Sequence, residues 1–213
     1  MSFALRKGGY MMEVKVIKSG LLQTNTYIVS KEHNCIIIDP AFACNDINEY
    51  IANNNLKVLG ILLTLGHFDH IDSCNTLAKQ YSCKVYIGEN DLNIVSDPNL
   101  NGSRRFLKRD IIIDKQYLSL FDHEIILKLD NFMIDVMFTP GHSRGSCCYL
   151  IGDELFSGDT LFKDGIGRVD LPEGNSQDMN RSLRHIFNLK NEIVVFPGHG
   201  SETSILKERN RYI

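Results

Sequence analysis

Several features that would define a class of function are missing from this chain of 213 residues. No segment approaches the roughly 20 consecutive apolar residues of a membrane-spanning helix, and no continuous apolar stretch follows the basic residues near the N-terminus, as it would in a secretory signal. No long run of Lys and Arg accompanies the net charge of -3. We therefore expect a cytoplasmic protein that has neither nucleic acid nor a membrane as its partner.

The six cysteines form no Cys-x-x-Cys pair, which argues against a zinc ribbon and suits reduced thiols. Cys147 and Cys148 are adjacent in the sequence, and a redox pair is one interpretation of them. Successive residues of a strand face opposite sides, so two small hydrophobic side chains are the favoured interpretation.

No linker or shift in composition divides the sequence, and its length fits one domain. Residues 1–11 precede Met12, where the first alternating segment begins. We interpret them as an N-terminal extension or a cloning scar and assign residues 12–213 to a single domain. The hydrophobic fraction of 43% and the charged fraction of 23% are ordinary, so the function must be inferred from motifs.

Short apolar segments predict strands in two blocks that are separated by helices. The first block contains Val14–Ile17, Thr26–Val29, Cys35–Ile38 and Leu59–Thr64. The second contains Glu124–Leu127, Phe132–Phe138, Cys147–Leu150 and Glu154–Phe156, and a buried strand, Ile193–Phe196, follows later.

Apolar residues at helical spacing predict a helix over residues 45–53, another from about Asp69 to Tyr81, and a third that Asn175 or Ser176 caps. Residues 90–114 are largely polar and predict an irregular excursion near the site, with some helix at its start. This order of elements predicts an α+β fold in which two sheets pack face to face with helices outside.

The segment Thr64 to His70, with the sequence TLGHFDH, follows an apolar strand and precedes a helix. His67, Asp69 and His70 offer two imidazoles and a carboxylate there, which are ligands that zinc, iron or manganese accept. Three later clusters, TPGH at residues 139–142, SGDT at 157–160 and FPGH at 196–199, each place one such residue beside glycine after a strand. Glycine lets the backbone turn sharply close to a crowded centre.

Any one of these residues by itself is typical of a hydrogen-bonded loop or a turn. Six of them in four matching contexts favour one common metal site: His67, Asp69, His70, His142, Asp159 and His199. The other histidines do not share the pattern, and we interpret His33, His123 and His185 as structural.

The series TLGHFDH, TPGHSRGS, SGDTLF and FPGHG resembles the metallo-β-lactamase superfamily, whose signature is THxHxDH followed by His, Asp and His. The resemblance spans about residue 12 to the C-terminus, and GIGRVDLPEG narrows it to small hydrolases similar to glyoxalase II. It implies an αββα sandwich of two packed mixed β-sheets, with helices on both outer faces and a two-metal site at one sheet edge.

The resemblance assigns His67 and His142 to the first metal, assigns Asp69, His70 and His199 to the second, and makes Asp159 the bridge between them. Leu65 stands where the family has the opening His of the first site, and leucine cannot bind a metal. We therefore expect a tighter second site and a first site that is weak, water-rich or empty. The expected cofactor is one or two zinc ions, with iron or manganese as alternatives.

Arg168, in GIGR, aligns with the basic position that contacts the thiol-conjugate substrate in glyoxalase II. A guanidinium there could clamp a carboxylate by a bidentate pair, or it could be a solvated loop side chain. Few residues follow His199, so we expect no counterpart of the helical domain that helps full-length glyoxalase II to bind glutathione.

Three functions remain open at this stage. The first is metal-dependent hydrolysis of a small acyl or thioester substrate by a monomer or small homo-oligomer, with Asp69 orienting the attacking water and Leu65 lowering the activity. The second is an iron-dependent persulfide dioxygenase in which His67, His142 and Asp159 form a 2-His-1-carboxylate set. The third is a non-catalytic protein that keeps a structural metal.

Overall fold

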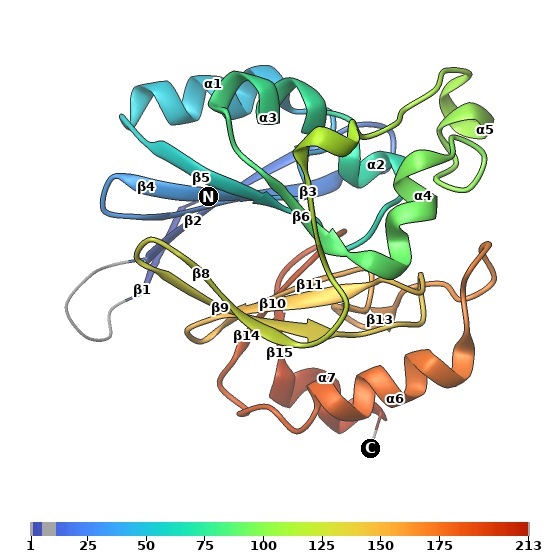
Figure 1. The fold of residues 1–213 in the computed structure, drawn as a ribbon. Coiled ribbons are helices and arrows are strands. Elements are labelled where there is room, and N and C mark those ends of the chain that lie inside the picture. Colours follow the sequence, from blue (N-terminus) through green and yellow to red (C-terminus); the bar gives the residue numbers. More distant parts are fainter. Residues whose placement is uncertain (1, 6–11, 213) are drawn as a thin grey trace.

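Two sheets pack against each other between two layers of helices (Figure 1). This computed structural model describes residues 2–5 and 12–212. The first sheet has seven strands, and their order in space follows the sequence: β1 (Ser2–Leu5), β2 (Met12–Ser19), β3 (Thr24–Lys31), β4 (Asn34–Ile38), β5 (Lys57–Leu62), β6 (Val85–Gly88) and β7 (Leu118–Phe121). The pairs from β1 to β4 are antiparallel, and those from β4 to β7 are parallel.

The second sheet has six strands in the order β15-β14-β11-β10-β9-β8, and only the pair β11 and β14 is parallel. Their bounds are β8 (Ile125–Leu129), β9 (Phe132–Phe138), β10 (Cys147–Ile151), β11 (Glu154–Gly158), β14 (Val194–Pro197) and β15 (Thr203–Ser204). Strands β12 (Leu161–Phe162) and β13 (Gly165–Ile166) form a separate two-stranded sheet. Both main sheets are mixed, as the sequence predicts.

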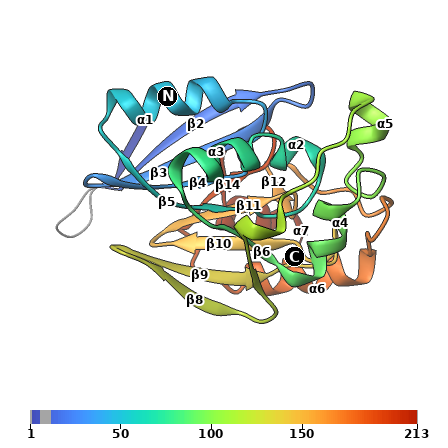
Figure 2. The same cartoon turned by 45° about the horizontal axis from the view of Figure 1, so that its top comes forward.

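Helices lie on the outer face of each sheet and at one edge of the sandwich (Figures 1 and 2). Helices α1 (Cys44–Asn53) and α3 (Cys74–Tyr81) cover the first sheet, and α6 (Ser176–Ile186) and α7 (Ile205–Tyr212) cover the second. Three short helices lie at the edge: α2 (Phe68–Ile71), α4 (Leu92–Ser96) and α5 (Ser103–Leu107). Two single 3-10 turns complete the set, η1 (Glu89–Asp91) and η2 (Lys115–Tyr117).

The core follows the two-residue period of the strands. In β4, Cys35 and Ile37 pack beneath the helices of the first sheet, whereas Ile36 and Ile38 point into the space between the sheets. Cys147 lies between the sheets and Cys148 beneath α6, so the adjacent pair faces opposite ways. Both are free thiols, and burial raises the pKa of Cys148 to about 12. They therefore act as small hydrophobic side chains, as the sequence interpretation favours.

The predicted helix from Asp69 to Tyr81 is interrupted. The backbone N–H of Ser73 donates to the carbonyl of Pro40 at 3.0 Å, and the Ser73 hydroxyl donates to the carbonyl of Ala41. These bonds replace the intrahelical bond of Ser73, so α2 ends before it and α3 begins after it. The chain at the C-terminal end of α2 is therefore held by the loop that follows β4.

The N-terminal segment that the sequence analysis interprets as an extension is described in part. Residues 2–5 form β1, which pairs with β2, while residues 1 and 6–11 of the predicted extension lie outside the described residues. Within the part of the chain that is described, no helix has the length and apolar character needed to cross a membrane.

Candidate metal centre

The six candidate ligands come together at the edge of the sandwich that carries α2. His67 precedes α2 in an extended conformation, with φ −71° and ψ 152°, and Asp69 and His70 follow in the helix. The other three come from loops after β9, β11 and β14. The polar contacts between these side chains fall into two groups on either side of Asp159.

The larger group surrounds one oxygen of Asp159. Its Oδ1 atom lies 3.6 Å from Nε2 of His70 and 3.5 Å from Nε2 of His199. Oδ2 of Asp69 lies 3.6 and 3.3 Å from the same two nitrogens. One ligand atom from each of Asp69, His70 and His199 falls within 4.8 Å of the others. These residues make up the second site of the sequence interpretation.

The smaller group surrounds the other oxygen of Asp159. Oδ2 lies 3.4 Å from Nε2 of His142, and the same nitrogen lies 2.9 Å from Nδ1 of His67. These are the residues of the first site. Asp159 therefore presents one oxygen to each group, which is the arrangement that a bridging carboxylate needs.

Leu65 does not join the first group. Its side chain is only 1% exposed, and it is absent from the described residues that line the cavity over the site. The position has become part of the packed interior. The first site thus offers two imidazoles and one carboxylate oxygen, and no described histidine takes the place of the missing one.

A buried cation fits the second site. Nε2 of His70 and Oδ1 of Asp159 are both buried, and neither has a hydrogen-bond partner among the described residues. Burying unpaired polar atoms costs free energy. A metal ion bound between them would satisfy both atoms, and nitrogen and carboxylate oxygen are suitable donors for zinc or iron.

The charges at the second site also fit a cation. Burial alone would lower the pKa of His70, but Asp69, Asp39 and Asp159 together raise it to about 10. Burial would raise the pKa of Asp69, yet His70 and His199 hold it well below its usual range. Without a metal, the His70 imidazolium is thus the cation among three carboxylates, and a metal would replace its proton.

His67 is in a different electrostatic environment. Burial, followed by repulsion from His142, lowers the pKa of His67 to about 3. The ring is therefore neutral at physiological pH, and neutral imidazole is the form that binds metals.

Carbonyl and carboxylate groups orient the three remaining rings. Nδ1 of His142 donates to the carbonyl of Arg168 at 2.8 Å, and Nδ1 of His199 donates to the carbonyl of Leu22 at 3.0 Å. Both bonds put a proton on Nδ1, so Nε2 is the ring nitrogen that faces the site. Nδ1 of His70 contacts Asp39 at 3.0 Å, which is the carboxylate–histidine pattern that fixes metal-ligating rings.

The glycines of the motifs are required by close approach, as the sequence analysis expects. A Cβ atom on Gly198 would lie 2.4 Å from Oδ1 of Asp159 and 2.9 Å from the His70 ring. Gly158 has a φ of +49°, and a Cβ atom there would lie 2.2 Å from the Thr64 hydroxyl. A larger residue at position 198 would therefore displace Asp159 and His70, and one at position 158 would displace Thr64.

Sequence reasoning missed two carboxylates that hold the site together. Asp39 accepts from the backbone N–H and the hydroxyl of Thr64 at 2.8 and 2.6 Å, in addition to contacting His70. It directly follows a predicted strand, so the rule that polar residues gather at strand ends could have found it. Asp91 follows β6, which the sequence analysis did not predict.

Asp91 joins the two loops that carry the first-site histidines. It is fully buried, and Oδ2 accepts from the N–H of Gly66 at 2.9 Å and from the hydroxyl of Ser143 at 2.7 Å. Oδ1 accepts from the N–H of Gly145 at 2.6 Å. Gly66 immediately precedes His67, and Ser143 immediately follows His142. Asp91 is therefore a positioning residue for both rings.

We expect Asp91→Ala to lower the free energy of unfolding by about 3 kcal/mol, because it removes three hydrogen bonds and leaves the buried N–H groups of Gly66 and Gly145 without an acceptor. Ser143→Ala removes only one of these bonds and should cost about 1 kcal/mol. Urea unfolding of the two variants and the wild type measures the difference. Equal losses in the two variants would show that Asp91 does not hold the loops.

The remaining candidate, Arg168, lines the same cavity. Its guanidinium is exposed and donates two hydrogen bonds of 2.7 Å to Asp170.

The histidines interpreted as structural take no part in the centre: His123 and His185 pair with Asp122 and Glu124, and His33 is exposed.

The centre lies at the base of a cavity of about 540 Å³. Its walls are largely apolar: Leu22, Leu100, Phe106, Phe162, Ile166, Leu171 and Pro172.

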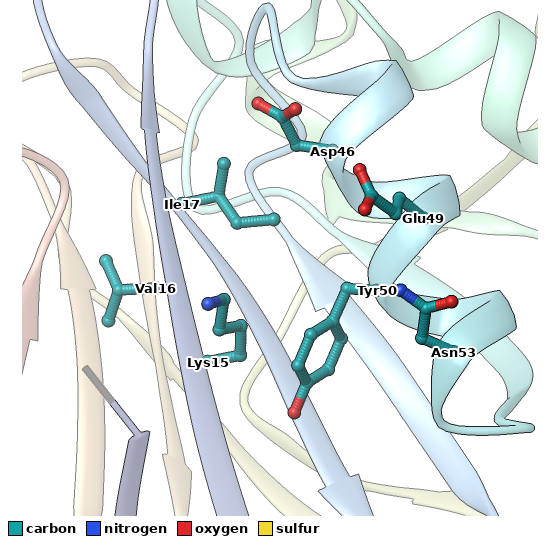
Figure 3. A pocket seen from close by; sticks show the side chains of 7 residues that line it. All are labelled: Lys15, Val16, Ile17, Asp46, Glu49, Tyr50 and Asn53. Carbon is teal, nitrogen blue, oxygen red and sulfur yellow. The ribbon is translucent and has the colours of Figure 1, made fainter.

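A second hollow, of about 380 Å³, lies between β2 and α1 (Figure 3). There the ammonium of Lys15 lies 5.5 Å from the ring of Tyr50, with Asp46 and Glu49 nearby. Among the described residues that line it, that hollow contains no histidine or cysteine, so it lacks the imidazole ligands of the first cavity.

Comparison with known proteins supports the same picture. The model of the metallo-beta-lactamase superfamily matches residues 19–199. The probable metallo-hydrolase YqgX of Bacillus subtilis is 36% identical over 195 residues, which cover 90% of this chain and 92% of that protein. A hydroxyacylglutathione hydrolase, GloC of Haemophilus influenzae, is 28% identical over 205 residues, with coverages of 93% and 95%.

Two solved structures are similar over nearly the whole chain. The BLEG-1 B3 metallo-beta-lactamase superposes with a TM-score of 0.88 at 35% identity, covering 92% of this chain and 96% of its own. TTHA1623, solved in a di-iron-bound form, has a TM-score of 0.79 at 30% identity with the same coverages. The fold prediction is thereby confirmed.

Proposed function

Because this chain belongs to the metallo-β-lactamase superfamily, we propose that it is a metal-dependent hydrolase that cleaves thioesters or closely related acyl compounds. The observation that carries this proposal is the position of Asp159. It presents one oxygen to each of two groups of ligand atoms, at the base of a largely apolar cavity that is open to small molecules.

The metal-binding residues follow from this arrangement. Asp69, His70 and His199 would hold one ion together with Oδ1 of Asp159, while His67 and His142 would hold a weaker one together with Oδ2. Zinc is the expected ion, and iron also suits these donors. A divalent ion bound there polarises an acyl carbonyl and lowers the pKa of water toward about 7.

The chain itself contributes orientation and the exclusion of bulk water. Oδ2 of Asp69 accepts from the Thr24 hydroxyl at 3.0 Å, which fixes the carboxylate at the base of the cavity. We propose that this carboxylate orients the attacking water as well as binding metal. Phe162 and Ile166 line the wall beside it, so an acyl group can be held against an apolar surface.

The thioester as substrate is supported by the name of one relative, the hydroxyacylglutathione hydrolase of Haemophilus influenzae. The BLEG-1 B3 metallo-beta-lactamase is a similar structure at higher identity, which supports β-lactam hydrolysis as a second candidate. Both reactions place a water molecule on an acyl carbon, so the same carboxylates would serve either.

A panel of thioesters and a chromogenic cephalosporin, assayed together with metal analysis, tests the proposal. We expect turnover of thioesters that falls at least about 100-fold in Asp69→Asn, because the amide cannot accept a proton from water. Arg184→Gln, on the exposed face of α6, should leave turnover unchanged. Cephalosporin turnover without thioester turnover would reassign the substrate. Full metal content with neither activity would indicate a non-catalytic metal-binding protein.

The iron-dependent alternative also has an observation in its favour. His142 lies in contact with both His67 and Asp159. Nδ1 of His67 is 2.9 Å from Nε2 of His142, and Oδ2 of Asp159 is 3.4 Å from the same nitrogen of His142. Two histidines and one carboxylate are the ligands of many non-haem iron centres. Oxygen consumption by the iron-loaded protein with a glutathione persulfide would support this function over hydrolysis.

A further inference from the structure

The cavity wall contains only two cationic side chains, Arg105 and Arg168, among the described residues that line it. Its acidic residues are Asp69 and Asp159, both at the base within the candidate metal centre. Away from the metal-binding residues, the wall is therefore largely apolar, with two asparagines, Asn99 and Asn101, and a positive charge. Such a wall favours a ligand that combines an apolar part with an anionic group.

The two arginines differ in how their charge is used. The Arg168 guanidinium already donates to both oxygens of Asp170, so an incoming anion would have to displace that carboxylate. Arg105 has no carboxylate partner among the described residues. Its guanidinium lies over the ring of Phe106, 5.5 Å from the centroid. A stacked guanidinium keeps its hydrogen-bond donors directed outward.

The Phe106 ring connects Arg105 to the metal centre. It stacks on Phe68 with 5.4 Å between centroids and 18° between planes. Phe68 lies between two candidate ligands in the sequence, His67 and Asp69. Phe106 is nevertheless 53% exposed, so much of this ring faces the cavity rather than the core.

The segment that carries Arg105 is anchored to α2 by its backbone. The carbonyl of Asn101 accepts from the N–H of Phe68 at 3.0 Å. The buried side chains of Asn101 and Ser103 close the loop, through bonds to the carbonyl and N–H of Ile111 at 2.8 and 3.1 Å. Arg105 therefore lies on a fixed segment next to the centre, within residues 90–114, for which the sequence predicts an irregular excursion near the site with some helix at its start.

We propose that Arg105 is the specificity-determining residue of the cavity, and that the substrate is an acyl compound carrying a carboxylate apart from the scissile bond and an apolar group that packs on Phe106. This inference rests on the proposed hydrolase function and names its substrate class. Arg168 serves instead through its backbone carbonyl, which orients His142.

Binding of a pair of non-hydrolysable ligands tests the role of Arg105 without relying on turnover. The pair is 5-oxo-5-phenylpentanoate, in which a methylene replaces the sulfur of a thioester, and its neutral amide. By calorimetry on the protein as purified with its metal, we expect the carboxylate to bind about tenfold more tightly than the amide. Arg105→Gln should abolish this preference, and Arg105→Lys should restore part of it.

Arg184→Gln is the matched control, because it removes one positive charge from a side chain that has no carboxylate partner within residues 2–5 and 12–212 and lies outside the cavity. A preference that survives in Arg105→Gln would overturn the proposal, as would an equal loss in Arg184→Gln. An absence of any preference in the wild type would overturn it as well.

Turnover of the matching substrates, S-benzoyl-3-mercaptopropanoate and its amide, separates this inference from the proposed function. We expect the ratio of kcat/KM between acid and amide to fall about tenfold in Arg105→Gln, mainly through KM. Arg105-dependent binding without hydrolysis of either thioester would contradict the proposed function alone. Hydrolysis of both thioesters with a ratio that does not depend on Arg105 would contradict the present inference alone.

Discussion

Asp159→Ala is expected to remove metal from both groups of ligands and to reduce hydrolysis by at least about 1,000-fold, whereas His142→Ala should affect only the first group. The reason is the division of the carboxylate, whose two oxygens face different nitrogens at 3.4 to 3.6 Å. Even residues that merely support a ligand change metal affinity by about 10- to 100-fold, so a shared ligand should have a larger effect. Metal content per chain and thioester turnover measure both consequences.

Asp159→Asn is the matched control for Asp159→Ala, because it keeps the shape of the side chain and removes its negative charge. We expect it to retain some metal at the second site, where Asp69 still supplies a carboxylate beside His70 and His199. Equal metal loss in Asp159→Ala and His142→Ala would show that the carboxylate does not bridge the two groups.

Leu65→His is expected to destabilise the metal-free protein and to raise the metal occupancy of the first site. Leu65 is fully buried, and replacing it by a polar ring loses about 2–3 kcal/mol of apolar burial. Residues two apart on an extended segment point to the same side, so an imidazole at this position could reach the metal of His67. Thermal unfolding with and without zinc, together with metal stoichiometry, tests both effects.

Zinc should recover most of the stability lost in Leu65→His, because ligands that bind only the folded state stabilise it. Leu65→Gln is the control, since it introduces a polar group of similar size that is a weaker ligand for zinc. It should lose stability without recovering it. An unchanged stoichiometry and no gain in turnover for Leu65→His would argue that the site has been remodelled for another role.

The ligand clusters were predictable because the strands before them were predicted, whereas the strand that leads to Asp91 was not predicted. The ligand clusters follow β5, β9, β11 and β14, and strands were predicted at all four places. Strand β6 (Val85–Gly88) lies in the parallel part of the sheet, where buried strands show no alternation, and it was not predicted. Asp91 at its end was therefore invisible as a site residue, although it positions the loops of the first site.

Tertiary contacts, which the sequence pattern does not show, determine the break between α2 and α3. The apolar stripe of Ile71, Cys74 and Leu77 continues across the junction of α2 and α3, so periodicity alone predicts one helix. The break comes from bonds between Ser73 and residues of the loop after β4, which lie more than 30 positions away. In α6, the interactions that begin the helix are local. Of the two predicted caps, Asn175 and Ser176, it is Asn175 that accepts from the N–H of Gln177 and of Asp178.

The bond from His199 to the carbonyl of Leu22 joins residues that are 177 positions apart, and Asn25 also donates to the carbonyl of Pro197. Contacts between such distant segments carry a large loop-closure cost and form late in folding. Asp69 and His70 emerge from the ribosome long before His199 can join them. Tight metal binding should therefore be among the last events in the folding of the chain. The ion would bind tightly only to molecules in which the N-terminal and C-terminal segments are already in contact.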